Sequence, residues 1–161
     1  MGLRECKVHF TAGGRKAKEA VISICGVVTR DERLRFPTGI QSLRLQFDDI
    51  HGLGLGLGPS IDGAVAFGHE HVRQIYQFVE CLPSDLETLI VHCKAGVSRS
   101  RAVAAALQRL CGEDDLGEFI EGVPNGDVYT KLLGLPPHPA PLQAFHQAQR
   151  AATRACLRSR L

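Results

Sequence analysis

One segment constrains the fold of this chain more than any other: an apolar run, then a loop of small residues, then an alanine-rich run. Thr88–Val91 is short and apolar, which predicts a strand buried on both faces, at the centre of a sheet. Residues 99–111 are rich in alanine and leucine, which predicts a helix. Between them, Gly96 permits a tight turn. The expected unit is strand, loop and helix, with Cys93 at the loop entrance and Arg99 at its exit.

The rest of the chain predicts a layered α/β fold. Three further segments have the composition or alternation of strands: Cys6–Phe10, Ala20–Cys25 and Ser42–Phe47. Four further segments are predicted helices: Gly68–Leu82, Asp114–Glu121, Asn125–Leu133 and Pro141–Leu157. We therefore expect a central, mainly parallel sheet of four to five strands flanked by helices, with a helical C-terminal half. Strict Gly-Leu alternation at Gly52–Pro59 predicts a loop, because glycine at every second position is costly to fix.

Size and charge limit the classes of function. A length of 161 residues and 44% hydrophobic residues suit one domain, 1–161, with a core over about 5–150 and a basic helix end at 150–161. A net charge of +2 argues against nucleic acid as a main partner. The chain has no apolar run long enough to span a membrane and no signal-peptide pattern, so we expect a cytoplasmic protein, without membrane insertion, that is a monomer.

The six cysteines give little support to a metal site. None belongs to a CxxC pair, and in a reducing compartment all are expected to be free thiols. No metal and no cofactor is expected. Most of these cysteines are predicted to be small buried side chains. Cys93 differs because of its neighbours.

The predicted loop suits an activated thiol. Cys93 would lie at a strand tip facing the N-terminus of the next helix, whose dipole favours negative charge. Arg99 adds a fixed positive charge, and thiols in such surroundings have pKa values of roughly 3.5 to 7.5. Ser100 is placed to donate a hydrogen bond to the sulfur, and His92 to orient the loop.

The same loop suits a phosphate group. Backbone amides at a helix N-terminus bind anions, and the arginine side chain offers two parallel N–H groups that match two phosphate oxygens. The expected phosphate-binding residues are Lys94, Ala95, Gly96, Val97, Ser98 and Arg99.

The run His92–Ser100 resembles the signature loop of the cysteine-dependent protein tyrosine phosphatase superfamily. The short chain resembles the small bacterial and dual-specificity-like branch of that superfamily, and Leu45–Ile50 and Pro124-Asn125 are also similar to its bacterial members. The resemblance covers residues 5 to about 150. It implies a metal-independent phosphoric monoester hydrolase, in which Cys93 forms a thiophosphoryl intermediate, Arg99 binds the phosphate and an aspartate acts as general acid and then base.

The identity of that aspartate is open between three residues. Asp48 and Asp49 follow a predicted strand end, and the bacterial pattern selects Asp49, although it precedes Cys93 by 44 residues. Asp62 precedes Cys93 by 31 residues, which fits the family spacing better, with the Gly-Leu segment as an insertion between the candidates. We take Asp49 as the first candidate, with Asp62 and Asp48 as alternatives.

Substrate and regulation are less constrained. Val97 stands where a lipid-phosphatase-like loop carries a second lysine, so a phosphoprotein or phosphopeptide is preferred over an inositol phosphate, with phosphotyrosine favoured and dual specificity open. The alternatives are a phosphate-binding pseudophosphatase that recognises phosphorylated partners and a related thiolate phosphatase acting on a non-protein substrate. If its strand neighbours that of Cys93, Cys25 could form a reversible disulfide with the nucleophile; the other interpretation is a buried core thiol.

Overall fold

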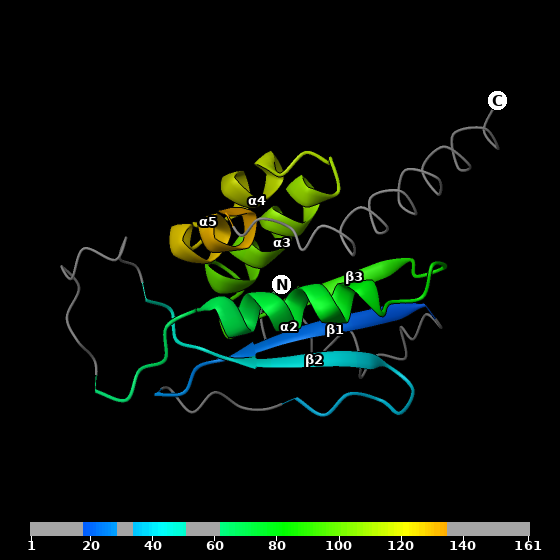
Figure 1. The fold of residues 1–161 in the computed structure, drawn as a ribbon, viewed down its shortest axis with the longest axis horizontal. Helices are drawn as coiled ribbons and strands as arrows, with labels where there is room; N and C mark the ends of the chain where they lie inside the picture. The colour runs from blue at the N-terminus through cyan, green and yellow to red at the C-terminus, as the bar shows by residue number, and fades with distance from the viewer. Residues whose placement is uncertain (1–17, 29–33, 51–61, 135–161) are drawn as a thin grey trace.

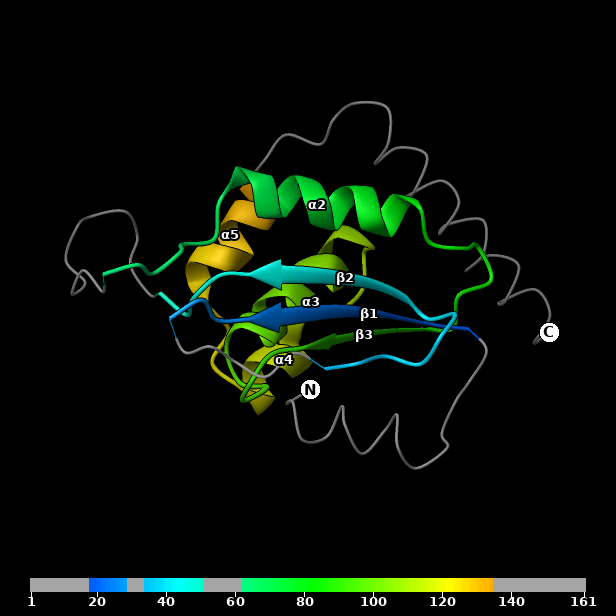
Figure 2. The ribbon, with the colours of Figure 1, turned by 90° about the horizontal axis from the view of Figure 1, so that it is seen from below.

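Residues 18–28, 34–50 and 62–134 are described by the computed structural model (Figures 1 and 2). Within these ranges, three strands form a parallel sheet and four helices lie on one side of it. No helix in the described ranges is both long and apolar enough to cross a lipid bilayer. Four predicted features lie outside them: the strand Cys6–Phe10, the loop Gly52–Pro59, the helix Pro141–Leu157 and the basic stretch 150–161.

The sheet has the order β2-β1-β3, with both pairs parallel. β1 (Glu19–Cys25) lies in the centre and is buried along its whole length. β2 (Gln41–Gln46) and β3 (Thr88–His92) flank it. Because the strands are parallel, their carboxyl ends meet at one edge of the sheet, where binding sites of α/β proteins lie.

The α/β class with a parallel sheet is confirmed, but two details of the sheet prediction were wrong. The described residues form three strands rather than four to five, since the other predicted strand lies outside them. Among the described strands β1 is central, and the strand at residues 88–91 lies beside it. Ile90 and Val91 of β3 are nevertheless buried, because helices cover one face and the segment before β2 covers the other.

The strand pleat divides the apolar side chains between two cores. Ile22, Ile24 and Val91 belong to the larger cluster, on the helix side. Val21 and Ile90 point to the opposite face and pack in a smaller cluster with Leu34, Phe36 and Ile40. Successive side chains of a strand point to opposite faces of the sheet, which explains why both faces carry apolar residues.

The predicted helices that fall in the described ranges are found within two residues of their expected bounds. They are α2 (His69–Glu80), α3 (Arg99–Leu110), α4 (Leu116–Glu121) and α5 (Gly126–Gly134). α2 buries Val72, Ile75 and Val79, one face of a 3.6-residue period. α3 ends before Gly112, which has a φ of 76°, a conformation that glycine adopts without strain.

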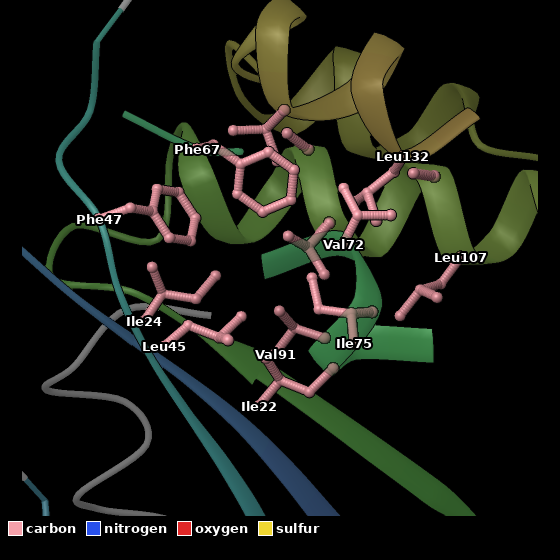
Figure 3. Packing of buried hydrophobic residues seen from close by; sticks show 14 of the residues in the cluster. Ile22, Ile24, Leu45, Phe47, Phe67, Val72, Ile75, Val91, Leu107 and Leu132 are labelled. Carbon is pink, nitrogen blue, oxygen red and sulfur yellow. The ribbon is translucent and has the colours of Figure 1, made fainter. Parts of the chain in front are cut away.

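The larger core joins the sheet to α2, α3 and α5 (Figure 3). Ile75 and Leu132 are fully buried in it, from α2 and α5. Fully buried alanines on the inner face of α3 leave room for the neighbouring elements: Ala102, Ala105 and Ala106. This packing fixes the start of α3, and with it the loop that precedes the helix.

Truncation of Ile75 is expected to destabilise the fold. Ile75→Ala removes a side chain that is 0% exposed and should lower the free energy of unfolding by about 2–5 kcal/mol, from lost burial plus a cavity. Ile120→Ala on α4 is the matched control, because Ile120 is 82% exposed. Urea unfolding followed by circular dichroism measures both variants. Equal effects would contradict the assignment of the core.

Candidate active site

Residues 93–98 form the loop between β3 and α3 at the carboxyl edge of the sheet. Cys93 is 2% exposed and packs against the larger core. Gly96 has a φ of 75°, which a residue with a side chain rarely adopts, so glycine is required for this turn. Lys94 and Ala95 are exposed, whereas Arg99 and Ser100 are buried at the start of α3.

The Cys93 sulfur is surrounded by hydrogen-bond donors. The Ser100 hydroxyl lies 3.2 Å from Sγ, and the Gly96 amide donates to Sγ at 3.3 Å. Burial by itself raises the pKa of Cys93, but the Ser100 and Gly96 hydrogen bonds and the charge of Arg99 outweigh it and lower that pKa. The predicted contact between Ser100 and the sulfur is therefore present, and the surroundings favour the thiolate.

Three successive carbonyls of the loop are hydrogen-bonded to neighbouring elements. Arg101 Nε donates to the Gly96 carbonyl at 3.1 Å, and the Val123 amide donates to the Val97 carbonyl at 3.0 Å. The Ser98 carbonyl accepts from the amides of Ala102, at 3.0 Å, and Asn125, at 3.4 Å.

These bonds also set the direction of the loop amides. In a planar trans peptide the N–H points opposite to the preceding carbonyl. The N–H groups of Val97, Ser98 and Arg99 therefore point away from the elements that bind the three carbonyls. Consecutive amides held in this way, at a helix N-terminus, form an anion-binding concavity.

Arg99 is 6% exposed and reaches from α3 towards the end of β2. Its Nη1 donates to the Phe47 carbonyl at 2.9 Å. The contact fixes the direction of a long side chain that would otherwise rotate, so the guanidinium is held in one orientation beside the loop.

Asp49 is the candidate acid that contacts the loop directly. Its Oδ1 accepts hydrogen bonds from Ser98 Oγ and from Asn125 Nδ2, both at 2.8 Å. The residue is exposed, so its carboxyl group can meet a substrate. The structure thus brings Asp49, Ser98 and Arg99 together at one edge of the sheet.

Asp48, directly before it, has a structural environment. Its Oδ1 accepts from the amides of Val27 and Val28 at 2.9 and 3.1 Å, and its Oδ2 accepts from the Val65 amide at 2.9 Å. Asp48 is 8% exposed. A buried carboxylate that accepts hydrogen bonds from three amides ties loops together, and these bonds occupy most of the lone pairs that a general base would use.

Asp62 lies on a turn with Gly63 and is exposed. In the described part of the chain no hydrogen bond joins its side chain to the loop at 93–98. The shorter sequence spacing to Cys93 therefore has no counterpart in a contact.

Sequence reasoning missed the roles of Asn125 and Arg101. Asn125 is 1% exposed; its Nδ2 donates to Asp49 and to the Ile50 carbonyl, and its Oδ1 accepts from the amides of Asp127 and Val128 at the start of α5. An asparagine at the start of a predicted helix indicates an N-cap, so the contacts of Asn125 with the start of α5 could have been predicted, but not its contact with Asp49. Arg101 had no comparable signal, because its partners lie 17 and 20 residues away.

Cys25 and Cys93 are both free and buried. Ser23 is in register with His92, so Ile24 and Cys93 follow on the same side of the sheet, and both belong to the larger core. Cys25, one residue further, points to the opposite face. A disulfide between the two thiols would therefore require the loop to rearrange, and the sheet favours the interpretation as a core cysteine.

His92 is 1% exposed and lies edge-on to Phe36, with 6.1 Å between the ring centroids. Burial lowers its pKa to about 4, although an interaction with the backbone of Cys93 opposes that shift. The ring contacts Phe36, which packs against the smaller core, on the side of the sheet away from the helices.

Within the described ranges, no group of three or more His, Cys, Asp and Glu side chains is arranged to hold a metal ion. The polar groups around the Cys93 loop are amides, a guanidinium, hydroxyls and a thiol, with the Asp49 carboxylate beside Ser98. The amides and the guanidinium suit an anion.

The fold is similar to one found in a solved structure. The crystal structure of human tyrosine phosphatase-like serine/threonine/tyrosine-interacting protein matches with a TM-score of 0.51 and 17% sequence identity, over 83% of this chain and 83% of that one. This likeness shows that the chain has a phosphatase-like fold. No protein-family model matches the chain. No curated protein matches it either.

Ser100→Ala is expected to raise the pKa of Cys93, because it removes the donor nearest the sulfur. The rate of iodoacetamide alkylation of the Cys93 peptide, followed by mass spectrometry across pH, should shift to higher pH. Ser98→Ala is the matched control, since that hydroxyl bonds Asp49 and not the sulfur. In the wild type, Cys93 should react at lower pH than Cys111, whose pKa burial raises to about 11. An unshifted profile in Ser100→Ala would contradict the assignment.

His92 should make the fold less stable as the pH falls. Its pKa is about 4 in the folded protein and 6.5 in its ordinary state, so the unfolded chain binds the proton more tightly. The stabilisation is complete above pH 6.5 and declines as the pH falls towards 4. In urea unfolding at several pH values, His92→Phe should reduce this decline, whereas His69→Gln, on the exposed side of α2, should not. Parallel pH profiles for His92→Phe and the wild type would refute the role of this ring.

Proposed function

We propose that the chain is a phosphoric monoester hydrolase that acts on phosphorylated protein, with phosphotyrosine favoured, through Cys93. One observation carries the proposal. The Cys93 sulfur is hydrogen-bonded to Ser100 and Gly96, and it lies in the same loop as backbone amides that are oriented to bind an anion. A thiolate next to a phosphate-binding loop can attack the group that the loop binds. The phosphatase-like fold is consistent with this chemistry.

In the first step, the Cys93 thiolate attacks phosphorus, the S–P bond forms and the bond to the leaving oxygen breaks. The loop amides and the Arg99 guanidinium stabilise the charge on the equatorial oxygens. Asp49 donates its proton to the leaving oxygen, so that the product departs as a neutral alcohol or phenol.

In the second step, a water molecule attacks the thiophosphoryl group and Asp49 takes its proton. The S–P bond breaks, and the sulfur leaves as a thiolate that accepts the hydrogen bond of Ser100 at 3.2 Å. The groups that lower the pKa of Cys93 therefore assist both steps, since they stabilise the same thiolate as nucleophile and as leaving group.

The choice of Asp49 rests on its contacts. It bonds Ser98 inside the loop, whereas Asp48 is buried among three amides. An acid that is hydrogen-bonded to the loop stays close to any anion that the loop binds, which general acid catalysis requires.

The exposed residues of the loop support a phosphoprotein substrate. Lys94 is the loop's lysine, and Val97 is 46% exposed. One flexible cation and one exposed apolar side chain fit a phosphorylated side chain on a peptide better than a highly charged inositol phosphate.

A phosphate-binding pseudophosphatase that recognises phosphorylated partners is the second candidate. It is favoured by the solved neighbour, which is a tyrosine phosphatase-like serine/threonine/tyrosine-interacting protein. Binding alone does not need an ionised thiol, however, and the donors around Cys93 act mainly on its ionisation. A related thiolate phosphatase with a non-protein substrate is a third candidate.

Hydrolysis of an aryl phosphate and of a phosphotyrosine peptide tests these candidates. The wild type should turn over both between pH 5 and 7, and Cys93→Ser should turn over neither. Asp49→Asn should lower kcat by about 10²- to 10⁴-fold, the usual range for loss of a general acid. Asp62→Asn, an exposed aspartate exchanged in the same way, should keep full activity.

Three outcomes would change the assignment. Peptide binding by the wild type without any turnover would favour the pseudophosphatase. Turnover of the aryl phosphate but not of the peptide would favour a non-protein substrate. Loss of kcat in Asp62→Asn with full activity in Asp49→Asn would move the general acid to Asp62.

A further inference from the structure

We propose that Arg101, on α3, is a positioning residue that uses α4 as a support to hold the loop's Gly96 carbonyl away from the bound phosphate. The expected effect on catalysis rests on the proposed function, whereas the contact between Arg101, the loop and α4 does not. Arg101 follows the Arg99-Ser100 pair and is separate from the arginine assigned to phosphate binding.

Arg101 connects three segments. Its Nε donates to the Gly96 carbonyl at 3.1 Å, and its Nη1 donates to Glu118 at 2.9 Å and to Glu121 at 2.8 Å. The Arg101 side chain is 19% exposed and that of Glu118 is 17% exposed. Exposed ion pairs contribute little, and Glu121 is 67% exposed, but the less exposed contact with Glu118 orients the guanidinium so that its Nε–H points in one direction.

That direction matters because Gly96 has no side chain to restrain its backbone. Its φ of 75° is one that glycine adopts without strain, and its amide, in the peptide before, donates to the Cys93 sulfur. If the peptide between Gly96 and Val97 rotated, its carbonyl would replace the Val97 N–H on the concave side. An acceptor would then face the anion. The bond from Arg101 opposes this rotation.

The end of α4 supports the adjacent peptide. The Val123 amide donates to the Val97 carbonyl at 3.0 Å. Gly122, before it, packs so closely that a Cβ there would lie 2.7 Å from the Val97 oxygen and 3.1 Å from the Arg101 Cγ. The segment after α4 therefore contacts the Val97 carbonyl directly, and α4 supports the Gly96 carbonyl through Arg101. A side chain at position 122 would push the loop and this segment apart.

Arg101→Met tests the proposal, with Arg109→Met as the matched control on the same helix. Arg109 is 65% exposed, and its nearest carboxylate oxygen is 4.0 Å away. The pH profile of Cys93 alkylation should shift to higher pH in Arg101→Met. We expect kcat/KM for an aryl phosphate to fall about 10- to 100-fold, the range for a slightly misplaced site. Arg109→Met should match the wild type in both measurements.

Gly122→Ala tests the same link from α4 and leaves both arginines in place. It should shift the alkylation profile in the same direction, and it serves as the test if Arg101→Met does not fold. If the folded variants have the alkylation profile of the wild type, the proposal is overturned. This holds whether or not they hydrolyse phosphate esters. If no protein has phosphatase activity, the proposed function fails, and the alkylation profiles still decide the positioning role.

Discussion

The carboxylate of Asp48 is the interaction on which the geometry of this edge depends. It accepts hydrogen bonds from amides in the turn after β1 and in the segment before α2. The backbone amide of Asp48 donates to the Val65 carbonyl at 2.7 Å. Buried carboxylates are costly unless their lone pairs are satisfied, so these bonds favour one arrangement of three chain segments. Asp49 and the Phe47 carbonyl flank Asp48, and the positions of both follow from it.

The local elements could be predicted from the sequence, but their order in the sheet could not. Apolar periodicity placed α2 and β1 within two residues, because side-chain burial and backbone period are coupled in one segment. The continuous apolar run at residues 88–91 was taken to be central, yet β1 holds that place. A run that is buried on both faces shows that both faces are covered, and it does not show how many strands lie beside it.

The contacts of the candidate site also divide into local ones, which could be predicted, and long-range ones, which could not. Cys93, Gly96 and Ser100 lie within one strand–loop–helix unit, so their contact followed from spacing alone. Asp49 reaches the loop across 49 residues of chain and Arg101 reaches Glu118 across 17, and each contact requires packing that no local pattern encodes. The choice between Asp48 and Asp49 is of this second kind, because neighbouring residues with the same side chain differ only in what surrounds them.

The ionisation of Cys93 shows why the packing around the loop matters to its chemistry. Burial raises the pKa of the thiol, and donors fixed by the fold reverse that effect. The Gly96 amide can lower the pKa only while its peptide keeps one orientation, and glycine supplies no restraint of its own. Contacts from outside the loop hold the peptides that follow: Arg101 binds the Gly96 carbonyl, on the other side of the same α-carbon, and Val123 and Asn125 bind the next two carbonyls. A reactive thiolate in this fold therefore depends on helices that never touch the sulfur.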